Sequence, residues 1–287
     1  MEVLDEVIEE PEKQYQSAKD VIFYYRFQQG KPALNIKSEN GKFTIRKLKR
    51  ETLVPDESVL SQRKDWEIYP EVTWLGEQFG RIQIFRNWTF GRSAPLRRPQ
   101  STDLPTGTVQ EHADNLGLVL NELQHTAAGS EFNRLMAKFL PRYQRFSSRI
   151  QGNTVQFYLH EEGLNSGVPA TRLSDGTIRF MAILCFLLSP TPPPLLCIDE
   201  PELGLHPDAV SLLAEVLVNA SARTQIIVTT HSDALVSALT EHADSVLVCE
   251  HLGETRIERV DSAKLKHWLG KYRLGDLWRI GELGGNP

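Results

Sequence analysis

The sequence predicts an α/β fold with a mostly parallel central sheet, preceded by an antiparallel β lobe. The apolar runs 195–198 and 226–228 end abruptly in polar residues, and the helix-length segment 209–220 lies between them. Short apolar runs joined by helices are typical of parallel strands that are buried on both faces of a sheet. Near the N-terminus, alternating segments are instead separated by Asn40-Gly41, a dipeptide that is a strong signal for an antiparallel hairpin.

The composition is that of an ordinary globular protein. With 287 residues, of which 40% are hydrophobic and 24% charged, the chain can form one large domain or two small ones. The net charge of -5 gives no overall attraction to nucleic acid or membranes. No apolar run reaches the ~18 residues of a membrane-spanning helix, and no secretion signal is recognisable, so we expect a cytoplasmic protein without membrane contact. Cys185, Cys197 and Cys249 lie in apolar segments without C-x-x-C spacing, which predicts buried free thiols.

The N-terminal part, residues 1–108, is predicted to be an antiparallel β lobe. Segments with strand-like composition are expected to form a meander at 21–27, 34–38 and 42–48. The segment 81–90, rich in Ile, Phe and Trp, is expected to add a strand to the same lobe. The acidic segment 1–20 tolerates a helix, and the segment 91–107, with several Pro, Ser and Thr residues, is predicted to be a loop or domain boundary.

Two basic clusters of this lobe allow two interpretations. They consist of Arg46, Lys47, Lys49 and Arg50, and of Arg92, Arg97 and Arg98. Such residues can contact a phosphate backbone. Neighbouring acidic residues, however, reduce the net positive charge of the first cluster. We therefore favour hydrated surfaces for both clusters.

The remaining residues, 109–287, are predicted to form an α/β domain. Helices are expected at 114–125, at 130–146 with a break near Pro141, and at 178–188, 209–220, 262–270 and 274–280. Strands are expected at 154–160, 195–198, 225–230, 245–250 and 255–260, and the last two are expected to close the central sheet.

Asp199 and Glu200 directly follow the apolar run 195–198. In open α/β sheets, ligands bind beyond the carboxyl ends of the strands, so we expect both carboxylates at the edge where chemistry takes place. Asp199 can hold Mg²⁺, which prefers oxygen ligands, and Glu200 can orient an attacking water. The alternative is that these two residues only begin a solvated loop.

Two further stretches are expected at the same edge. In 173–177, read Leu-Ser-Asp-Gly-Thr, Ser174 is a suitable N-cap for a following apolar helix, and Gly176 allows a ligand to approach the backbone closely. The N-terminus of such a helix attracts anions. The run 225–230 delivers His231, which can contact a phosphate or the water. Each stretch alone is compatible with a structural role, but their order along the chain favours phosphoryl-transfer chemistry.

In this order the motifs resemble those of a known family. Residues 173–176 resemble the signature loop of ABC-type ATPases, 195–200 a Walker B strand with its catalytic glutamate, and 226–231 the H-loop. The segment 199–207, read Asp-Glu-Pro-Glu-Leu-Gly-Leu-His-Pro, is most similar to AAA-type ATPases related to RecF, to SMC heads and to the ATPase half of OLD proteins. The resemblance implies the fold of a P-loop NTPase with an ABC-type ATPase head.

The resemblance also implies a function, namely binding and hydrolysis of ATP, with Mg²⁺, between two heads of a homodimer. It assigns Mg²⁺ binding to Asp199, the role of general base to Glu200 and γ-phosphate sensing to His231. The residues that it assigns to the ATP of the opposite subunit are Leu173, Ser174, Asp175, Gly176 and Thr177, with His206 near the dimer seam. A role in DNA maintenance or anti-phage defence, with DNA as a partner, is implied by the resemblance alone.

Asp175 and Thr177 depart from the Leu-Ser-Gly-Gly-Gln signature of transporters, which disfavours a transporter ATPase. A P-loop of the form Gly-x-x-x-x-Gly-Lys-Ser/Thr is not found, because no Gly-Lys pair has the required glycine or hydroxyl neighbour. We expect an N-terminal P-loop part to be missing, which would leave an unpaired sheet edge, exposed apolar surface and an inactive, poorly soluble chain. Three explanations stay open: a fragment, a split protein with a P-loop-bearing partner, or a non-hydrolysing switch module.

Overall fold

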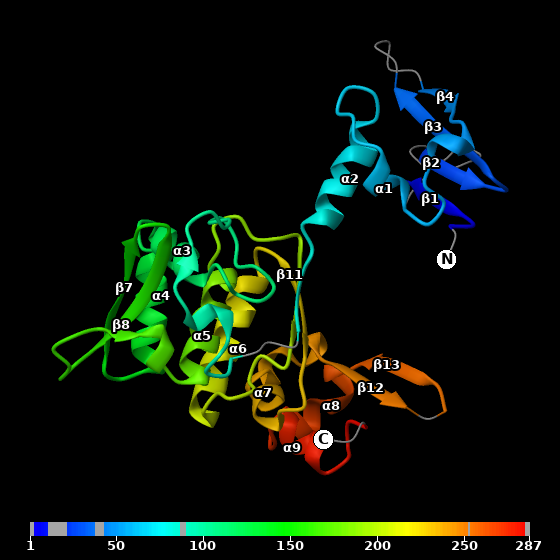
Figure 1. The fold of residues 1–287 in the computed structure, drawn as a ribbon. Coiled ribbons are helices and arrows are strands. Elements are labelled where there is room, and N and C mark those ends of the chain that lie inside the picture. Colours follow the sequence, from blue (N-terminus) through cyan, green and yellow to red (C-terminus); the bar gives the residue numbers. More distant parts are fainter. Residues whose placement is uncertain (1–2, 11–21, 38–42, 87–89, 252, 285–287) are drawn as a thin grey trace. The chain divides into compact units, whose positions relative to one another are not determined.

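The computed structural model describes residues 3–10, 22–37, 43–86, 90–251 and 253–284. The predicted turn at Asn40-Gly41 lies outside these residues. The chain forms two compact units, Met1–Ile82 and Gln83–Pro287 (Figure 1). These units are defined by packing within the chain, whereas the predicted boundary after residue 108 concerns ATPase lobes and stays a prediction.

The first unit contains an antiparallel sheet in the order β1-β2-β3-β4. Its strands are β1 (Glu6–Glu9), β2 (Phe23–Gln28), β3 (Lys31–Lys37) and β4 (Phe43–Lys47). The meander predicted for 21–48 is therefore confirmed for the described residues. Gln29 and Gly30, with φ of 53° and 73°, form the tight turn between β2 and β3, as expected for a two-residue hairpin. The expectation that 1–20 tolerates a helix is wrong at β1, because Glu6 to Glu9 pair with β2.

Two helices that the sequence analysis did not predict complete the first unit. They are α1 (Val59–Gln62) and α2 (Pro70–Gly80). Val59 and Val72 from these helices are buried together with Tyr25, Phe27 and Leu34 of the sheet. The helices therefore provide the cover that one face of this small sheet needs.

The second unit is built on a parallel sheet in the order β11-β10-β5. Its strands are β5 (Gln83–Phe85), β10 (Leu195–Asp199) and β11 (Gln225–Thr229). The strands predicted at 195–198 and 225–230 are confirmed. The assignment of 81–90 to the antiparallel lobe is wrong, because β5 pairs with β10, and Phe85 stacks on Phe186 at 4.3 Å in the core of this unit.

Helices and a second sheet cover one face of the parallel sheet. The helices are α3 (Leu116–Leu123), α4 (Ala127–Phe139), α5 (Asp175–Leu187) and α6 (Pro207–Ser221). The second sheet consists of β6 (Gln100–Ser101), β7 (Tyr143–Gln151), β8 (Thr154–Glu161) and β9 (Val168–Pro169). Figure 1 shows the helices between this sheet and β11, and one continuous apolar core joins these layers. The predicted break near Pro141 is confirmed, but the residues after it form β7 and not a helix. They pair with β8, with one register shift between Tyr143 and Arg145.

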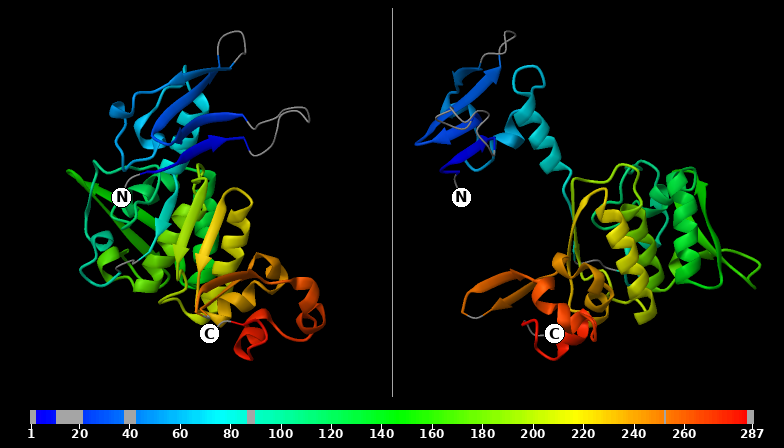
Figure 2. Two further views of the ribbon diagram at one scale, coloured as in Figure 1. Left: turned by 90° about the vertical axis from the view of Figure 1, so that its right-hand side faces the viewer. Right: turned by 180° about the vertical axis from the view of Figure 1, so that it is seen from behind.

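The other face of the parallel sheet carries exposed apolar residues. Cys197 of β10 stands in register with Ile84 of β5 and Ile227 of β11, and the two isoleucines are 53% and 48% exposed. The left view of Figure 2 looks onto this face, and no helix of the second unit lies in front of it there. The strands of this sheet were predicted to be buried on both faces. Burial is confirmed only for the face that carries Leu196 and Ile198. Within the described chain, β11 pairs on one side only.

The C-terminal part adds a hairpin and short helices. The elements are α7 (Asp233–Ala238), β12 (Leu247–His251), β13 (Thr255–Arg259), α8 (Ser262–Leu269) and α9 (Leu274–Arg279). The two strands form a separate antiparallel pair, so the prediction that they close the central sheet is wrong. Cys185 is buried, Cys197 partly exposed and Cys249 exposed, which corrects the prediction of three buried thiols. Among the described residues, no helix is both long and apolar enough to cross a membrane.

Candidate functional site

The carboxyl edge of the parallel sheet brings together the polar residues that end β10 and β11. Asp199 stands in register with Thr229, and the Thr229 hydroxyl donates a hydrogen bond to Oδ1 of Asp199. Asp199 is exposed to solvent. Its carboxylate is thus oriented by the neighbouring strand while it stays accessible to a ligand.

Glu200 has a backbone conformation that is unusual for a residue with a side chain. Its φ is 45°, in the left-handed region, and its N–H donates to the carbonyl oxygen of Thr229 at 3.0 Å. A side chain makes the left-handed conformation unfavourable by about 1–2 kcal/mol. Such strain persists only where surrounding contacts impose it, and it is concentrated at functional sites.

His231 contacts Glu200 with both its backbone and its ring. The His231 N–H donates to Oε2 of Glu200 at 3.2 Å, and Nε2 lies 3.7 Å from Oε1. The His231 side chain is 81% exposed, whereas the Glu200 side chain is 18% exposed. The structure therefore brings Asp199, Glu200 and His231, which were predicted from separate motifs, to one edge.

Glu202 is a buried acidic residue behind this edge that the sequence analysis did not single out. The Thr230 hydroxyl donates to Oε1 of Glu202, and Thr230 Oγ1 also accepts a hydrogen bond from the Ser232 N–H at 2.9 Å. Burial raises the pKa of Glu202 to about 7, the hydrogen bond from Thr230 opposes this rise, and Glu200 adds to it. In the sequence, the only signal that points to Glu202 is its position as a further acidic residue in the turn that follows Asp199 and Glu200.

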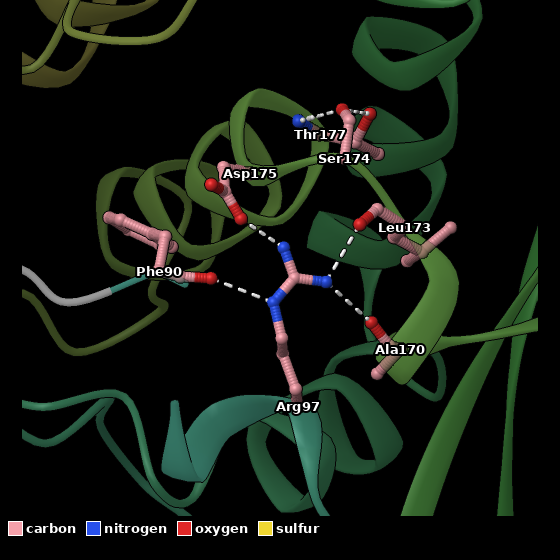
Figure 3. Close-up of polar contacts among 7 residues, drawn as sticks. All are labelled: Phe90, Arg97, Ala170, Leu173, Ser174, Asp175 and Thr177. Atoms are coloured by element: carbon pink, nitrogen blue, oxygen red, sulfur yellow. Dashed lines mark hydrogen bonds and ion pairs between the residues drawn. The ribbon is translucent and has the colours of Figure 1, made fainter. Parts of the chain in front are cut away.

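The predicted signature loop begins α5. Ser174 is the N-cap, because its hydroxyl accepts a hydrogen bond from the Thr177 N–H at 3.1 Å and lies 2.7 Å from Thr177 Oγ1 (Figure 3). Gly176 packs directly against the carbonyl oxygen of Gly204, and a Cβ atom would have no room there. The glycine is therefore required for contact with the turn after Pro201, and its predicted role in the approach of a ligand stays a prediction.

Arg97 fixes the predicted signature loop through hydrogen bonds and an ion pair. Its Nε donates to the Phe90 carbonyl at 2.7 Å, and Nη1 donates to the carbonyls of Ala170 at 3.0 Å and Leu173 at 2.7 Å. Figure 3 shows Nη2 pointing at Asp175, with which it forms an ion pair. Arg97 is only 3% exposed, so the interpretation of this residue as part of a hydrated surface is wrong. The ion pair also gives Asp175 a structural role, because its carboxylate compensates the positive charge of the buried Arg97 guanidinium.

An open cavity of about 550 Å³ lies at this loop. It is lined by Arg92, Arg97, Thr171, Arg172, Leu173, Ser174 and Asp175. Leu173 is largely buried, whereas Ser174 and Asp175 are exposed. The arginine side chains and the N-terminus of α5 favour negative charge in this cavity.

His206 caps a different helix. Its Nδ1 accepts a hydrogen bond from the Asp208 N–H at 3.3 Å at the start of α6, and its side chain is 75% exposed. The contacts described for His206 are thus within its own helix, and its predicted place at a dimer seam stays a prediction.

Asp199 fits a magnesium ion as one ligand among several. Among the described residues, no group of three or more His, Cys, Asp and Glu side chains is arranged to hold a metal ion. Mg²⁺ usually keeps several waters and takes one or two carboxylates together with substrate phosphates. An exposed carboxylate oriented by Thr229 meets this requirement, whereas a metal cage made of protein alone is not formed by the described part of the chain.

Comparison with known proteins gives a family and a distant relative. A family model described as "AAA domain, putative AbiEii toxin, Type IV TA system" matches residues 15–237. The Old nuclease of Escherichia phage P2 is 39% identical over 74 residues, which cover 25% of this chain. The match spans only 12% of the length of that protein.

Solved structures with similarity include heads of SMC proteins. An SMC head bound to the C-winged helix domain of ScpA is 12% identical with a TM-score of 0.45, and the match covers 87% of this chain and 78% of the other. The SMC head domain from Thermotoga maritima is 15% identical with a TM-score of 0.38, covering 83% and 75% of the two chains.

Proposed function

Because the chain belongs to the AAA-domain family whose model matches residues 15–237, we propose that it binds and hydrolyses ATP at the sheet edge of Asp199, Glu200 and His231. The family match confirms the resemblance to AAA-type ATPases and the P-loop NTPase type of fold. The observation that carries the proposal is the contact of His231 with Glu200, beside an exposed Asp199 at the carboxyl ends of adjacent parallel strands.

Each residue at the edge has a role that its contacts support. Asp199 would hold Mg²⁺, which neutralises charge on the phosphate oxygens when it is bound. Glu200, held by the His231 N–H, would take a proton from the attacking water. The exposed ring of His231 would donate a hydrogen bond to a terminal phosphate oxygen.

The proposal extends to a dimer in which two heads share the nucleotides. Ser174, Asp175 and Gly176 would then face the phosphates bound by the partner, and His206 would lie near the seam. The exposure of Ser174 and the positive character of the cavity beside it support this arrangement. From the family resemblance, we also propose that a phosphate-binding loop on a partner or a further segment completes the site, and that turnover is coupled to DNA maintenance or defence.

The test is Mg²⁺–ATP binding measured by titration calorimetry on the protein together with the partner or segment that carries the phosphate-binding loop, with Asp199→Ala as the variant. Asp103→Ala is the matched control, because Asp103 is also an exposed aspartate and is not one of the residues to which the proposal gives a role. We expect at least a roughly tenfold loss of affinity for Asp199→Ala, since a charge-assisted contact is about 1.5–3 kcal/mol, and no change for the control. Equal binding by the wild-type protein and Asp199→Ala would refute the site.

Hydrolysis is tested separately with Glu200→Gln. This variant keeps an oxygen that can accept from the His231 N–H but cannot take a proton from water. We expect it to bind ATP without turnover and to accumulate as a dimer in sedimentation experiments. Turnover at the wild-type rate would contradict the role of Glu200. Binding without turnover by the wild-type protein as well would favour a switch module over an ATPase.

A further inference from the structure

The C-terminal hairpin presents an open strand edge. Within the described chain, β13 pairs with β12 alone, and all five residues of β13 are exposed. Figure 1 shows the hairpin extending away from α8 and α9. A two-stranded sheet is marginally stable by itself, and an exposed edge is a template for pairing with another strand. The sequence of β13 therefore determines which strand this edge accepts.

The hydrogen bonds of the hairpin determine which backbone groups of β13 point to the open edge. The Val260 N–H donates to the Val246 carbonyl at 3.0 Å, one residue beyond the paired strands. In an antiparallel pair, hydrogen-bonded and non-hydrogen-bonded positions alternate along the strands. Residues 256 and 258 therefore direct their backbone groups at β12. Residues 255, 257 and 259 direct their N–H and C=O groups at the open edge.

The charges of β13 are complementary to those of a second copy of the same strand. If two copies run antiparallel with Ile257 opposite itself, the outward backbone groups of both copies meet. In this register Arg256 of each copy lies opposite Glu258 of the other, at positions where antiparallel side chains are closest. A shift by two residues in either direction would place Arg256 opposite itself or Glu258 opposite itself. Like charges directly opposite are unfavourable, so the sequence favours one register.

The apolar residues of the hairpin favour the same register. Ile257 is 63% exposed and stands opposite Cys249 of β12, which is also exposed. Leu247 is exposed on the same face, because side chains two residues apart in a strand point to the same side. With Ile257 opposite itself, the two isoleucines and the two Cys249 side chains would form one apolar row across the joined hairpins.

We propose that β13 is an interface between two copies of this chain. The two hairpins join along β13 into one antiparallel sheet, with a two-fold axis at Ile257. Such an interface is self-complementary, as a two-fold contact requires. It uses no residue that has a role in the proposed function and needs no nucleotide. It is therefore separate from the proposed dimer in which two heads share nucleotides.

The first test is sedimentation equilibrium of the protein without nucleotide. A contact made by one pair of strands is small, so we expect a reversible dimer with a Kd on the order of 10–100 μM. Ile257→Pro should be monomeric at these concentrations, because proline removes an N–H that points outward and is not used within the hairpin. A wild-type protein that stays monomeric well above this range, or an Ile257→Pro variant that dimerises equally well, overturns the proposal.

Exchange of charges tests the register. Arg256→Glu should weaken the dimer about tenfold, because it places like charges opposite each other. Arg256→Glu combined with Glu258→Arg restores opposite charges, and we expect its Kd within about threefold of the wild-type value. Arg256 also forms an ion pair with Glu254 of its own chain at 2.9 Å, but both variants lose this pair, so their comparison isolates the contact between copies.

The matched control for the charge change is Lys266→Glu, at an exposed position of α8. We expect this variant to dimerise as the wild-type protein does. If Lys266→Glu weakens the dimer as much as Arg256→Glu, or if the double variant is as weak as the single one, the pairing of Arg256 with Glu258 is wrong and the proposal is overturned.

The second test is hydrogen exchange of single amides, measured by NMR below and above the Kd. We expect the amides of 255, 257 and 259 to be protected only in the dimer, whereas those of 256 and 258 are protected at both concentrations by β12. The same protection at 256 and 258 in Ile257→Pro shows that the hairpin is retained. Exchange at 255, 257 and 259 that is independent of concentration overturns the proposal, because packing of apolar faces alone would leave these amides open.

These tests keep the inference apart from the proposed function. If the protein dimerises through β13 but does not bind Mg²⁺–ATP, the proposed function fails and the interface stands. If a dimer forms only with nucleotide and Ile257→Pro leaves it unchanged, the proposed sharing of nucleotides stands and the β13 interface is refuted.

Discussion

The left-handed backbone of Glu200 leads to a prediction about the relative stability of two variants. Glu200→Ala and Glu200→Gly remove the same side-chain contacts, but only alanine keeps the Cβ atom that conflicts with a φ of 45°. That conflict costs about 1–2 kcal/mol, whereas glycine costs about 0.5–1 kcal/mol more chain entropy than alanine. The difference between the centres of these two ranges predicts that Glu200→Gly is more stable than Glu200→Ala by about 0.8 kcal/mol.

The measurement is urea-induced unfolding followed by circular dichroism, with both variants in the same background so that the contribution of the first unit cancels. The matched control is the same pair at Glu215, which lies in the interior of α6. There we expect alanine to be the more stable variant by about 1 kcal/mol, as in any helix. If alanine is at least as stable as glycine at residue 200, Glu200 is not strained, and the argument for an imposed conformation at this site fails.

Three further predictions concern residues that hold the site. Arg97→Lys should lower the free energy of unfolding by about 2–4 kcal/mol, because one ammonium group cannot reach three carbonyls and Asp175 together. Faster hydrogen exchange of the backbone amides at 170–175 should accompany the loss of these hydrogen bonds. Gly176→Ala should destabilise by about 2 kcal/mol or more, because its Cβ meets the Gly204 carbonyl, while Gly91→Ala, which has open space, should not in the same urea titration. Since burial raises the pKa of Glu202 from 4.5 to about 7, the stability from its protonated form is complete below pH 4.5 and is lost as pH rises through about 7. We therefore expect the free energy of unfolding of the wild-type protein to fall between pH 5 and pH 8 by at most about 3 kcal/mol more than that of Glu202→Gln. Equal pH dependence of the two proteins would contradict the raised pKa.

The residues at the sheet edge could be predicted because their signals are local. Asp199 and His231 each end an apolar run, and the parallel pairing of two such runs places them together without further information. The N-cap role of Ser174 depends only on the residues that follow it, and the structure has it as expected. Where the sequence signal and the structural element involve the same few residues, the prediction and the structure agree.

The supports of the site depend on partners that are distant in the sequence. Arg97 lies in a segment whose prolines and serines indicate a loop, and only the carbonyls of Ala170 and Leu173 make it a buried residue. The segment at 143–151 shows the same dependence, because pairing with β8 converts an expected helix into a strand. Glu202 was passed over because its burial follows from α5 and Thr230, which the residues near it do not reveal.

The pairing of β5 with β10 also determines the order in which the protein can fold during synthesis. Ile84 leaves the ribosome long before its partner Cys197, so the central sheet cannot begin to form until most of the chain has been made. The first unit has only local strand pairs and can fold early, as N-terminal units commonly do. Contacts that join distant residues form slowly. Phe85 and its neighbours therefore stay unpaired until β10 has been synthesised, and apolar residues left exposed in this way favour aggregation of a nascent chain.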